Sequence, residues 1–356
     1  MTTQYQNRLR MEIIQKADAV IAELPAFSGK FFNSLKTKGF SPRTVLQYAY
    51  DTKNFFDYLK AQPGFKLTHW QSCTASEILD KLTYDDIQEY LNTLEYYTPS
   101  GTDEKRPSSP SSKARKISSL RSFYKFFFKT GEIKNNLADL MELPKIPDHT
   151  ILVLNPSQIQ RLLEAIESDE GLTDKEKVSR KMTRKRDFAI VTLLLGTGMR
   201  VSELVGVDLD DIDFYEASIL ITRKGGDQDQ VYFGEQVEGA LRDYIENERD
   251  LLKPSGKDKN ALFISLHHKR ISTRSVEILV KKYTGRAGIN LKISPHKLRS
   301  TFGTALYEET GDIYLVADAL HHSSVETTRK HYAKMSRDHK REAARISDNL
   351  FQKKDL

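Results

Sequence analysis

The sequence has 356 residues, 38% hydrophobic and 10% aromatic, which is enough for two domains that each bury a core. Cys73 is the only cysteine, so an intrachain disulfide and a secreted disulfide scaffold are excluded. The longest apolar stretch, 188–195, is far shorter than a membrane span of ~20 residues, and the N-terminus has no apolar secretory core. We therefore expect a cytoplasmic protein without membrane contact.

The formal net charge of +6 is unevenly distributed along the chain. Residues 105–131 include eight basic side chains and no acidic one, and residues 175–186 include seven basic side chains and one acidic one. These segments carry +8 and +6, which leaves −8 for the rest of the chain. Such concentrated positive charge suits a protein that binds nucleic-acid phosphates, although a solvated helix face is the commoner explanation of any single charge run.

The N-terminal half reads as helices joined by polar loops. After a helix over 8–22, Ser41-Pro42 supplies a cap and first position for a helix over 43–60 with near-helical apolar spacing. Thr83 caps the next helix, which has acids in its first turn and runs to about residue 94.

A basic aromatic segment follows a Pro/Ser/Gly loop at 98–112. Residues 113–131 alternate basic and aromatic side chains and end at Gly131, so they predict a helix with one packed face and one face toward phosphates. A short helix over 136–142 precedes residues 143–156, whose three prolines and lack of periodicity predict an interdomain linker.

The C-terminal half combines further helices with one hairpin. Asn155-Pro156 opens a helix to Glu167, and a charged insertion over 168–183 precedes a strongly apolar helix over 184–195. Strand-like residues 217–222 and 230–233 flank a LysGlyGlyAsp turn. Further helices are predicted over 235–252, 272–287, 295–310, 312–320 and 325–333. The predicted fold is mainly α with a small antiparallel β-sheet.

Four segments of this half carry polar groups that suggest chemistry. They are GTGMRVSEL with Arg200 and Glu203, ITRKGGDQ with Lys224, SPHKLRSTF with His296 and Arg299, and LHHSSVETTRKHY with His322 and Tyr332. Each segment alone is a weak signal, because arginines after turns and His-x-x-Arg pairs are common and a single tyrosine is usually a packing residue. What suggests a shared function is their order along one chain.

With these segments the chain resembles the tyrosine recombinase (lambda-integrase-like) family, most closely its Xer-type members, which resolve bacterial chromosome dimers. The resemblance covers nearly the whole chain and includes SPRTVLQYAYDTKNFF, SSLRSFYKFF, LPK, TGMRVSELVGVDLDDID, SPHKLRSTFGTAL and HSSVETT. It implies a helical core-binding domain and a catalytic domain that close on DNA as a C-shaped clamp. It also implies that Arg200, Lys224, His296, Arg299, His322 and Tyr332 are catalytic, with Glu203 in support.

The chemistry of these side chains suits phosphoryl transfer. Negative charge grows on the non-bridging oxygens as a nucleophile approaches, and the forked donors of Arg200 and Arg299 can stabilise it. A neutral His322 can donate one further hydrogen bond.

Proton transfers account for the other residues. Tyr332, with a free pKa of about 10, needs a base to attack phosphorus, and His296 is the candidate. Lys224 can protonate the leaving 5′ oxygen, and Glu203 orients histidine or arginine side chains. The product is a 3′-phosphotyrosine that a 5′ hydroxyl resolves, so no ATP, metal or other cofactor is implied.

The expected organisation follows from the same resemblance. Residues 1–142 form the core DNA-binding domain, 143–156 the linker, 157–335 the catalytic domain and 336–356 a tail helix that packs on a neighbouring subunit. The expected partners are a double-stranded recombination site and three further copies of the chain in a tetramer on two sites, and a septal DNA translocase is a candidate further partner. The predicted DNA-binding residues are Arg43, Lys105, Arg106, Lys113, Arg115, Lys116, Arg121 and Lys125.

Several alternatives remain open. An integrase of a phage or conjugative transposon shares the chemistry but often carries an additional arm-binding domain, whereas the residues before Ser41 read as helix. A topoisomerase of the same chemistry would need no specific site, and a non-catalytic DNA-binding regulator would explain the basic segments alone. A metal site is disfavoured because the nine histidines lack an HExxH or CxxC motif.

In its C-terminal half the chain departs from the family pattern at two places. Leu320-His321-His322 stands where the family usually has Leu-Gly-His, so a bulky residue replaces glycine. His322 and Tyr332 are ten positions apart, one more than is usual, and Ser323-Ser324 can absorb the added residue at an irregular junction.

Overall fold

The computed structural model describes residues 4–65, 69–97, 104–147, 152–223, 227–321, 325, 326 and 328. The chain divides at residue 149 into two compact units, each with its own hydrophobic core. We call them the N-terminal unit and the C-terminal unit. Within the described ranges, no helix is both long and apolar enough to cross a membrane.

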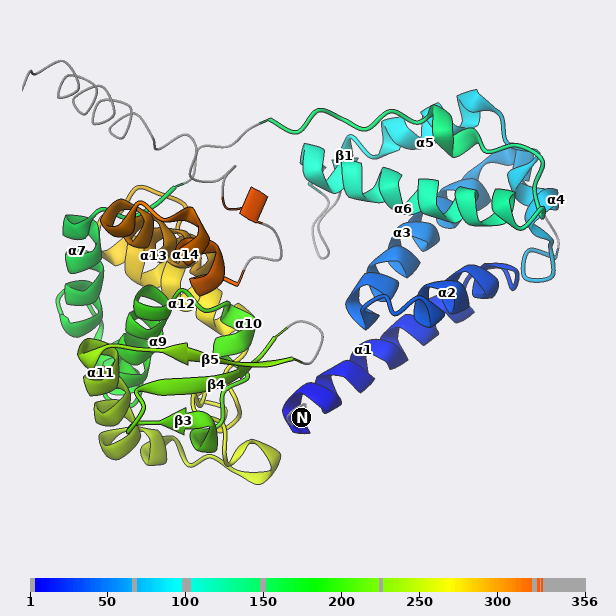
Figure 1. The fold of residues 1–356 in the computed structure, drawn as a ribbon. Coiled ribbons are helices and arrows are strands. Elements are labelled where there is room, and N and C mark those ends of the chain that lie inside the picture. Colours follow the sequence, from blue (N-terminus) through cyan, green and yellow to red (C-terminus); the bar gives the residue numbers. More distant parts are fainter. Residues whose placement is uncertain are drawn as a thin grey trace, which may run out of the picture. The chain divides into compact units, whose positions relative to one another are not determined.

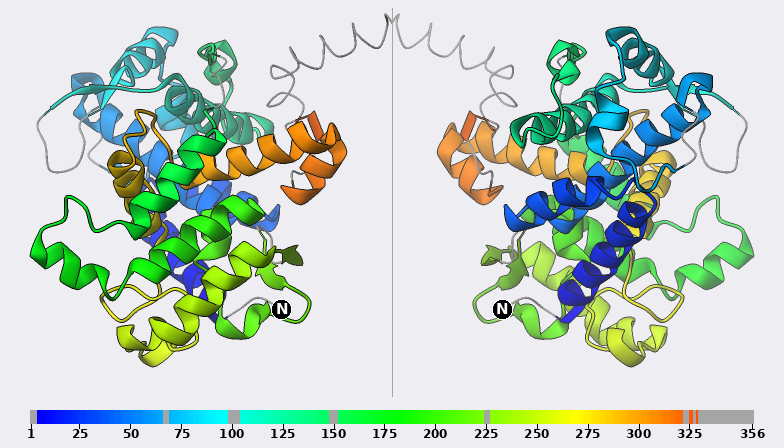
Figure 2. Two further views of the ribbon diagram at one scale, coloured as in Figure 1. Left: turned by 90° about the vertical axis from the view of Figure 1, so that its left-hand side faces the viewer. Right: turned by 90° about the vertical axis from the view of Figure 1, so that its right-hand side faces the viewer.

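Helices dominate the N-terminal unit (Figure 1; Figure 2). The long helix α1 packs against α3, which in turn packs against α6. The helices are α1 (Gln4–Ala22), α2 (Ser28–Thr37), α3 (Pro42–Ala61), α4 (Ala75–Leu79), α5 (Tyr84–Thr93) and α6 (Pro110–Lys129), and two-residue strands β1 (Tyr96–Tyr97) and β2 (Arg106–Pro107) pair antiparallel. Single 3-10 turns lie at Pro63–Phe65 and Leu137–Leu140.

Local capping fixes two of these helix starts as the sequence predicted. The Ser41 hydroxyl accepts a hydrogen bond from the Thr44 N–H at 3.2 Å, with a proline at the first helical position of α3. At α5, Thr83 and Asp86 form a capping box in which each side chain accepts from the other residue's N–H, at 3.3 and 2.7 Å. Both predictions are confirmed.

Aromatic side chains fill the core of this unit. Phe56 on α3 and Phe123 and Phe127 on α6 surround Phe27, with the Phe27 and Phe127 ring centroids 5.2 Å apart and nearly perpendicular. Such edge-to-face pairs add about 0.5–1.5 kcal/mol to the burial of the rings. The aromatic stripe predicted over 113–131 is therefore the packed face of α6.

Three details of this unit differ from the sequence prediction. Helices α2 and α4 were not predicted, and α4 is a five-residue helix whose capping box, Thr74 with Glu77, is the main local signal. The predicted loop 98–112 ends early because Ser109 caps α6 four residues before the predicted start. The predicted helix over 136–142 is a single 3-10 turn.

The C-terminal unit is built around α9, an almost entirely buried helix with α7, α11, α12 and α13 packed on it (Figure 1). A helix that is apolar on every side must be surrounded in this way. The helices are α7 (Pro156–Glu167), α8 (Asp174–Arg180), α9 (Arg184–Thr197), α10 (Val201–Leu204), α11 (Glu235–Asn247), α12 (Thr273–Arg286), α13 (Pro295–Thr310) and α14 (Ile313–Ala319).

One antiparallel sheet completes the unit, in the order β3 (Ile212–Asp213), β4 (Ser218–Thr222), β5 (Gln228–Tyr232). Ile219 pairs with Val231 and Leu220 with Gln230, which confirms the predicted hairpin and a mainly α fold with a small sheet. The two-residue strand β3 was not predicted. Since side chains alternate between faces, Ile219, Ile221 and Val231 share the buried face.

The second basic segment, residues 175–186, is partly buried, whereas its charge predicted a surface that contacts nucleic-acid phosphates. Arg180 ends α8, a helix within the predicted insertion, and is buried against Asp169 and the carbonyls of Ile166 and Ser168. Arg186 is buried at the start of α9 and pairs with Asp187 at 2.6 Å. These two cations stabilise the fold and are not exposed to a phosphate backbone.

Candidate active site

Arg200 lies at the N-terminus of α10, directly after the turn that ends α9. Gly198 makes this turn in the left-handed conformation, with φ 62°. The buried Glu203 carboxylate accepts from the Arg200 backbone N–H at 2.7 Å and from its Nη1 at 2.8 Å. Glu203 thus holds Arg200 at two points, while 39% of the Arg200 side chain stays exposed.

Arg299 is buried on the second turn of α13. Its Nη1 donates to the Gly198 carbonyl at 2.5 Å, and its Nη2 donates to the Leu320 carbonyl. The guanidinium therefore ties the end of α9 to the end of α14. A guanidinium has five N–H donors, more than these two carbonyl contacts use.

Both arginines contact the same short backbone segment. Arg200 Nη2 donates to the His321 carbonyl at 3.2 Å, one residue after the carbonyl that Arg299 contacts. His296 lies one turn before Arg299, exposed on α13. The structure therefore brings Arg200, Glu203 and Arg299 together beside the residue that precedes His322 in the sequence.

Two residues of the hairpin join this cluster and were missed by the sequence prediction. Arg223 Nη1 lies 3.4 Å from Glu203 Oε1, and Arg223 Nε donates to Asp229 Oδ2 at 2.8 Å. The same Asp229 oxygen lies 2.9 Å from His321 Nδ1. In the sequence, only the position of Arg223 beside Lys224 suggested a role for it. No spacing rule predicts that side chains of the β4–β5 hairpin lie near residue 321.

The surroundings of His321 disfavour its charged form. Burial and the nearby Arg223 guanidinium lower the pKa of the His321 imidazole, and the Asp229 carboxylate partly offsets them. The neutral imidazole, which these surroundings favour, can use one ring nitrogen as donor and the other as acceptor.

Five predictions fall wholly or mostly on residues that the structure does not describe. Lys224 belongs to the segment between β4 and β5, and His322 and Tyr332 follow α14; all three lie outside the described residues. So do the tail over 336–356 and most of the helix predicted over 325–333. Their roles stay predictions.

Two family models match the chain. The model of the "Phage integrase family" matches residues 153–339, and that of the "Phage integrase, N-terminal SAM-like domain" matches residues 29–131. The first match spans more than half of the sequence. The chain belongs to the phage integrase family. It is a site-specific tyrosine recombinase, an enzyme that cleaves and rejoins DNA.

Curated relatives agree with this assignment. The chain is 34% identical to tyrosine recombinase XerC of Caldanaerobacter subterraneus subsp. tengcongensis over 319 residues, which cover 85% of this chain and 82% of the relative. It is 31% identical to tyrosine recombinase XerD of Corynebacterium glutamicum over 291 residues, with coverage of 82% and 87%.

Solved structures share the fold. The XerH site-specific recombinase bound to a palindromic difH substrate has a TM-score of 0.62 at 20% identity, over 90% of this chain and 85% of XerH. The Tn1549 transposon integrase in complex with circular intermediate DNA has a TM-score of 0.61 at 20% identity, over 86% of this chain and 95% of the integrase.

The predicted DNA-binding residues of this recombinase fall into two groups. Three of them already have a carboxylate partner: Arg106 with Glu104, Lys113 with Glu95, and Arg115 with Asp51. The other five, Arg43, Lys105, Lys116, Arg121 and Lys125, form no ion pair with any residue that the structure describes.

The pair of Arg115 and Asp51 differs from a surface ion pair. The Asp51 side chain is 3% exposed, and burial raises the pKa of its carboxyl against the opposing effect of Arg115. Asp51 therefore fixes the Arg115 guanidinium on α6, with 38% of the arginine side chain still exposed. The role of all eight residues in DNA binding stays a prediction.

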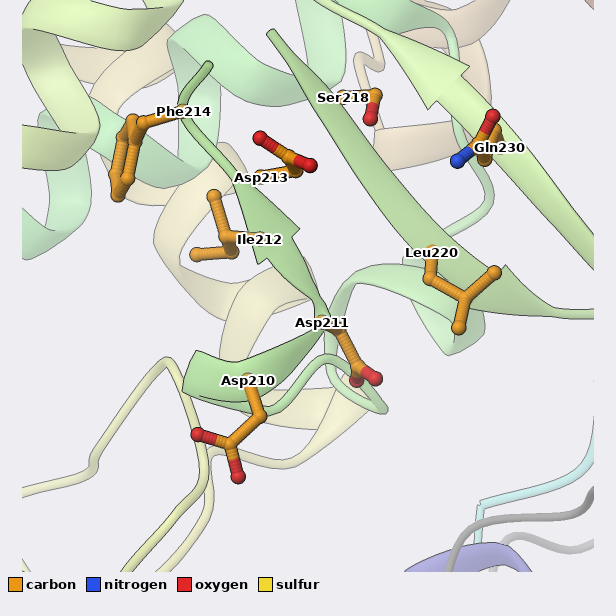
Figure 3. A pocket seen from close by; sticks show the side chains of 8 residues that line it. All are labelled: Asp210, Asp211, Ile212, Asp213, Phe214, Ser218, Leu220 and Gln230. Carbon is orange, nitrogen blue, oxygen red and sulfur yellow. The ribbon is translucent and has the colours of Figure 1, made fainter. Parts of the chain in front are cut away.

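A pocket of about 350 Å³ on the sheet is acidic and does not suit DNA phosphates (Figure 3). Asp210, Asp211 and Asp213 line it beside Leu220 and Gln230. Because side chains alternate along a strand, Leu220 and Gln230 lie on the opposite face of the sheet from Ile221 and Asp229, which pair with each other. Ile221 precedes Arg223 by two residues. The pocket is therefore separate from the arginine cluster.

Metal coordination finds no support in the described part of the chain. No group of three or more histidine, cysteine, aspartate or glutamate side chains there could hold a metal ion.

Proposed function

We propose that this recombinase resolves chromosome dimers in the cytoplasm by exchanging strands between two dif-like DNA sites, with Tyr332 as nucleophile. The observation that carries the catalytic part is the convergence of Arg200 and Arg299 on the carbonyls of Leu320 and His321. A phosphate beside this segment would meet the exposed side of Arg200, where a forked donor stabilises growing negative charge.

The remaining roles are carried over from the sequence. Tyr332 attacks phosphorus with His296 as base, and a 3′-phosphotyrosine forms while the 5′ oxygen leaves. Lys224 protonates that oxygen, and His322 donates to a non-bridging oxygen. Glu203 acts through Arg200, because its carboxylate already binds that residue's N–H and guanidinium.

Dimer resolution is favoured over integration of a mobile element by the relatives. XerC and XerD proteins align with more than four fifths of this chain, and XerH was solved on a difH substrate. By the same reasoning, a tetramer of this chain assembles on two sites, and a septal DNA translocase is a candidate activator.

Replacement of Tyr332 by phenylalanine tests the proposed nucleophile. Tyr332→Phe removes one oxygen and should abolish the covalent protein–DNA adduct on a nicked dif-like suicide substrate, with DNA affinity changed by less than about 1 kcal/mol. Tyr314→Phe is the matched control, since Tyr314 is 70% exposed on α14 and should leave the adduct yield unchanged. An adduct formed by Tyr332→Phe, or a phosphopeptide at another tyrosine, would refute the assignment.

A further inference from the structure

Five residues of the C-terminal unit form a closed ring of contacts, four of them between side chains and one to a backbone carbonyl. Arg200 contacts Glu203 at 2.8 Å, Glu203 contacts Arg223 at 3.4 Å, and Arg223 contacts Asp229 at 2.8 Å. Asp229 contacts His321 at 2.9 Å, and the His321 carbonyl accepts from Arg200 at 3.2 Å. The ring joins α10, the β4–β5 hairpin and the end of α14.

Two members of the ring are covalent neighbours of predicted catalytic residues. Arg223 directly precedes Lys224, and His321 directly precedes His322. Consecutive Cα atoms are 3.8 Å apart, so a contact that fixes one residue restricts its neighbour. The shared link between these two positions is the Asp229 carboxylate, since its Oδ2 lies within 3 Å of both Arg223 Nε and His321 Nδ1.

The backbone conformation of His321 is unfavourable for a residue that carries a side chain. Its φ of 46° lies in the left-handed region, which is strained for a residue with a Cβ atom. Glycine would adopt this φ without that strain. The imidazole instead lies against Asp229 with 26% of its side chain exposed.

We propose that His321 and Asp229 are positioning residues that couple the β4–β5 hairpin to the turn after α14, so that Lys224 and His322 act on the same phosphate. The Asp229 carboxylate is well placed for this task. Its Oδ1 accepts from the Gln230 backbone N–H at 2.8 Å while its Oδ2 faces the other two side chains. Neither residue contacts the reacting atoms; both act through their neighbours.

The test measures the first-order rate constant of adduct formation at saturating protein on a nicked dif-like suicide duplex. His321→Gly and Asp229→Ala should each lower it about tenfold or more, because loss of alignment slows the chemical step. The Kd for the same duplex should change less than about twofold. The double variant should be no slower than the slower single variant, since both changes break one link.

A sulfur substrate separates positioning from a general structural defect. With sulfur in place of the bridging 5′ oxygen, the leaving group needs no proton, so the part of the Asp229→Ala defect that acts through Lys224 disappears. The loss in Asp229→Ala should therefore shrink at least about threefold on this substrate. An equal loss on both substrates overturns the proposal.

His268→Gly is the matched control. His268 also has a left-handed φ, 58°, and its Nδ1 lies 2.7 Å from the Leu252 carbonyl, in a turn that contributes nothing to the ring. This variant should retain the wild-type rate. His321→Gly should keep the wild-type Tm, because glycine relieves backbone strain.

The proposal rests on the proposed function, and the outcomes are distinguishable. Absence of an adduct with the wild-type protein refutes the function. A wild-type adduct together with a wild-type rate in His321→Gly, or independent losses that multiply in the double variant, refutes only the coupling.

Discussion

Replacing Gly198 by alanine should destabilise the C-terminal unit more than the same change at Gly311. Both glycines end a helix in the left-handed conformation, with φ of 62° and 64°, so an added Cβ costs about 1–2 kcal/mol of backbone strain at either site. At Gly198 that Cβ would also lie 2.4 Å from Phe302 Cδ1 and 3.0 Å from Leu320 Cδ2, whereas nothing lies within 4 Å at Gly311.

The clash sets the size of the difference. Overpacking of this kind costs about 1–3 kcal/mol. At ~3 °C per kcal/mol for a domain of this size, Gly198→Ala should melt about 3–9 °C below Gly311→Ala. It should also slow adduct formation, because Arg299 Nη1 donates to the Gly198 carbonyl.

Thermal unfolding followed by circular dichroism measures this difference. The only tryptophan, Trp70, packs on Phe56 in the N-terminal unit, so its fluorescence should report a transition that neither variant changes. Equal Tm values for Gly198→Ala and Gly311→Ala would show that Phe302 moves aside without cost and would refute the packing argument.

Two further predictions concern the chemistry. Cleavage of a nicked site should survive excess EDTA, because arginine and lysine side chains supply the positive charge; abolition of cleavage that zinc or magnesium restores would contradict this mechanism. Lys224→Ala should be slow on ordinary DNA and largely recover when sulfur replaces the bridging 5′ oxygen, since a thiolate departs without a proton. Equal impairment on both substrates would instead assign Lys224 to DNA binding.

Local sequence signals, such as capping residues, predicted the elements that local interactions determine. Asn155 caps α7 through a reciprocal capping box with Gln158, at 2.8 and 3.0 Å, and the start of this helix was predicted as it is found. Helix α4 and strand β3 were missed because five and two residues are too short to show a period.

In the candidate site, too, only contacts between residues close together in the sequence could be predicted. Glu203 was predicted to orient histidine or arginine side chains, and the structure joins its carboxylate to Arg200 at 2.8 Å. The links of Asp229 to Arg223 and His321 depend on how β4, β5 and α14 meet in space. Sequence spacing carries no information about such contacts, and it likewise gave no sign that carbonyls of Ile166 and Ser168 would take up Arg180.

The ion pairs of the N-terminal unit bear on how this protein would respond to ionic strength. A cation whose charge a buried carboxylate already balances, as Asp51 balances Arg115, would bring little net positive charge to a DNA phosphate and would therefore displace few condensed ions. The salt dependence of binding follows the number of counterions released, and a count of basic residues on α6 therefore overstates it. If Arg115 contacts the duplex as predicted, its guanidinium would already be oriented by Asp51 and would lose little side-chain freedom on binding.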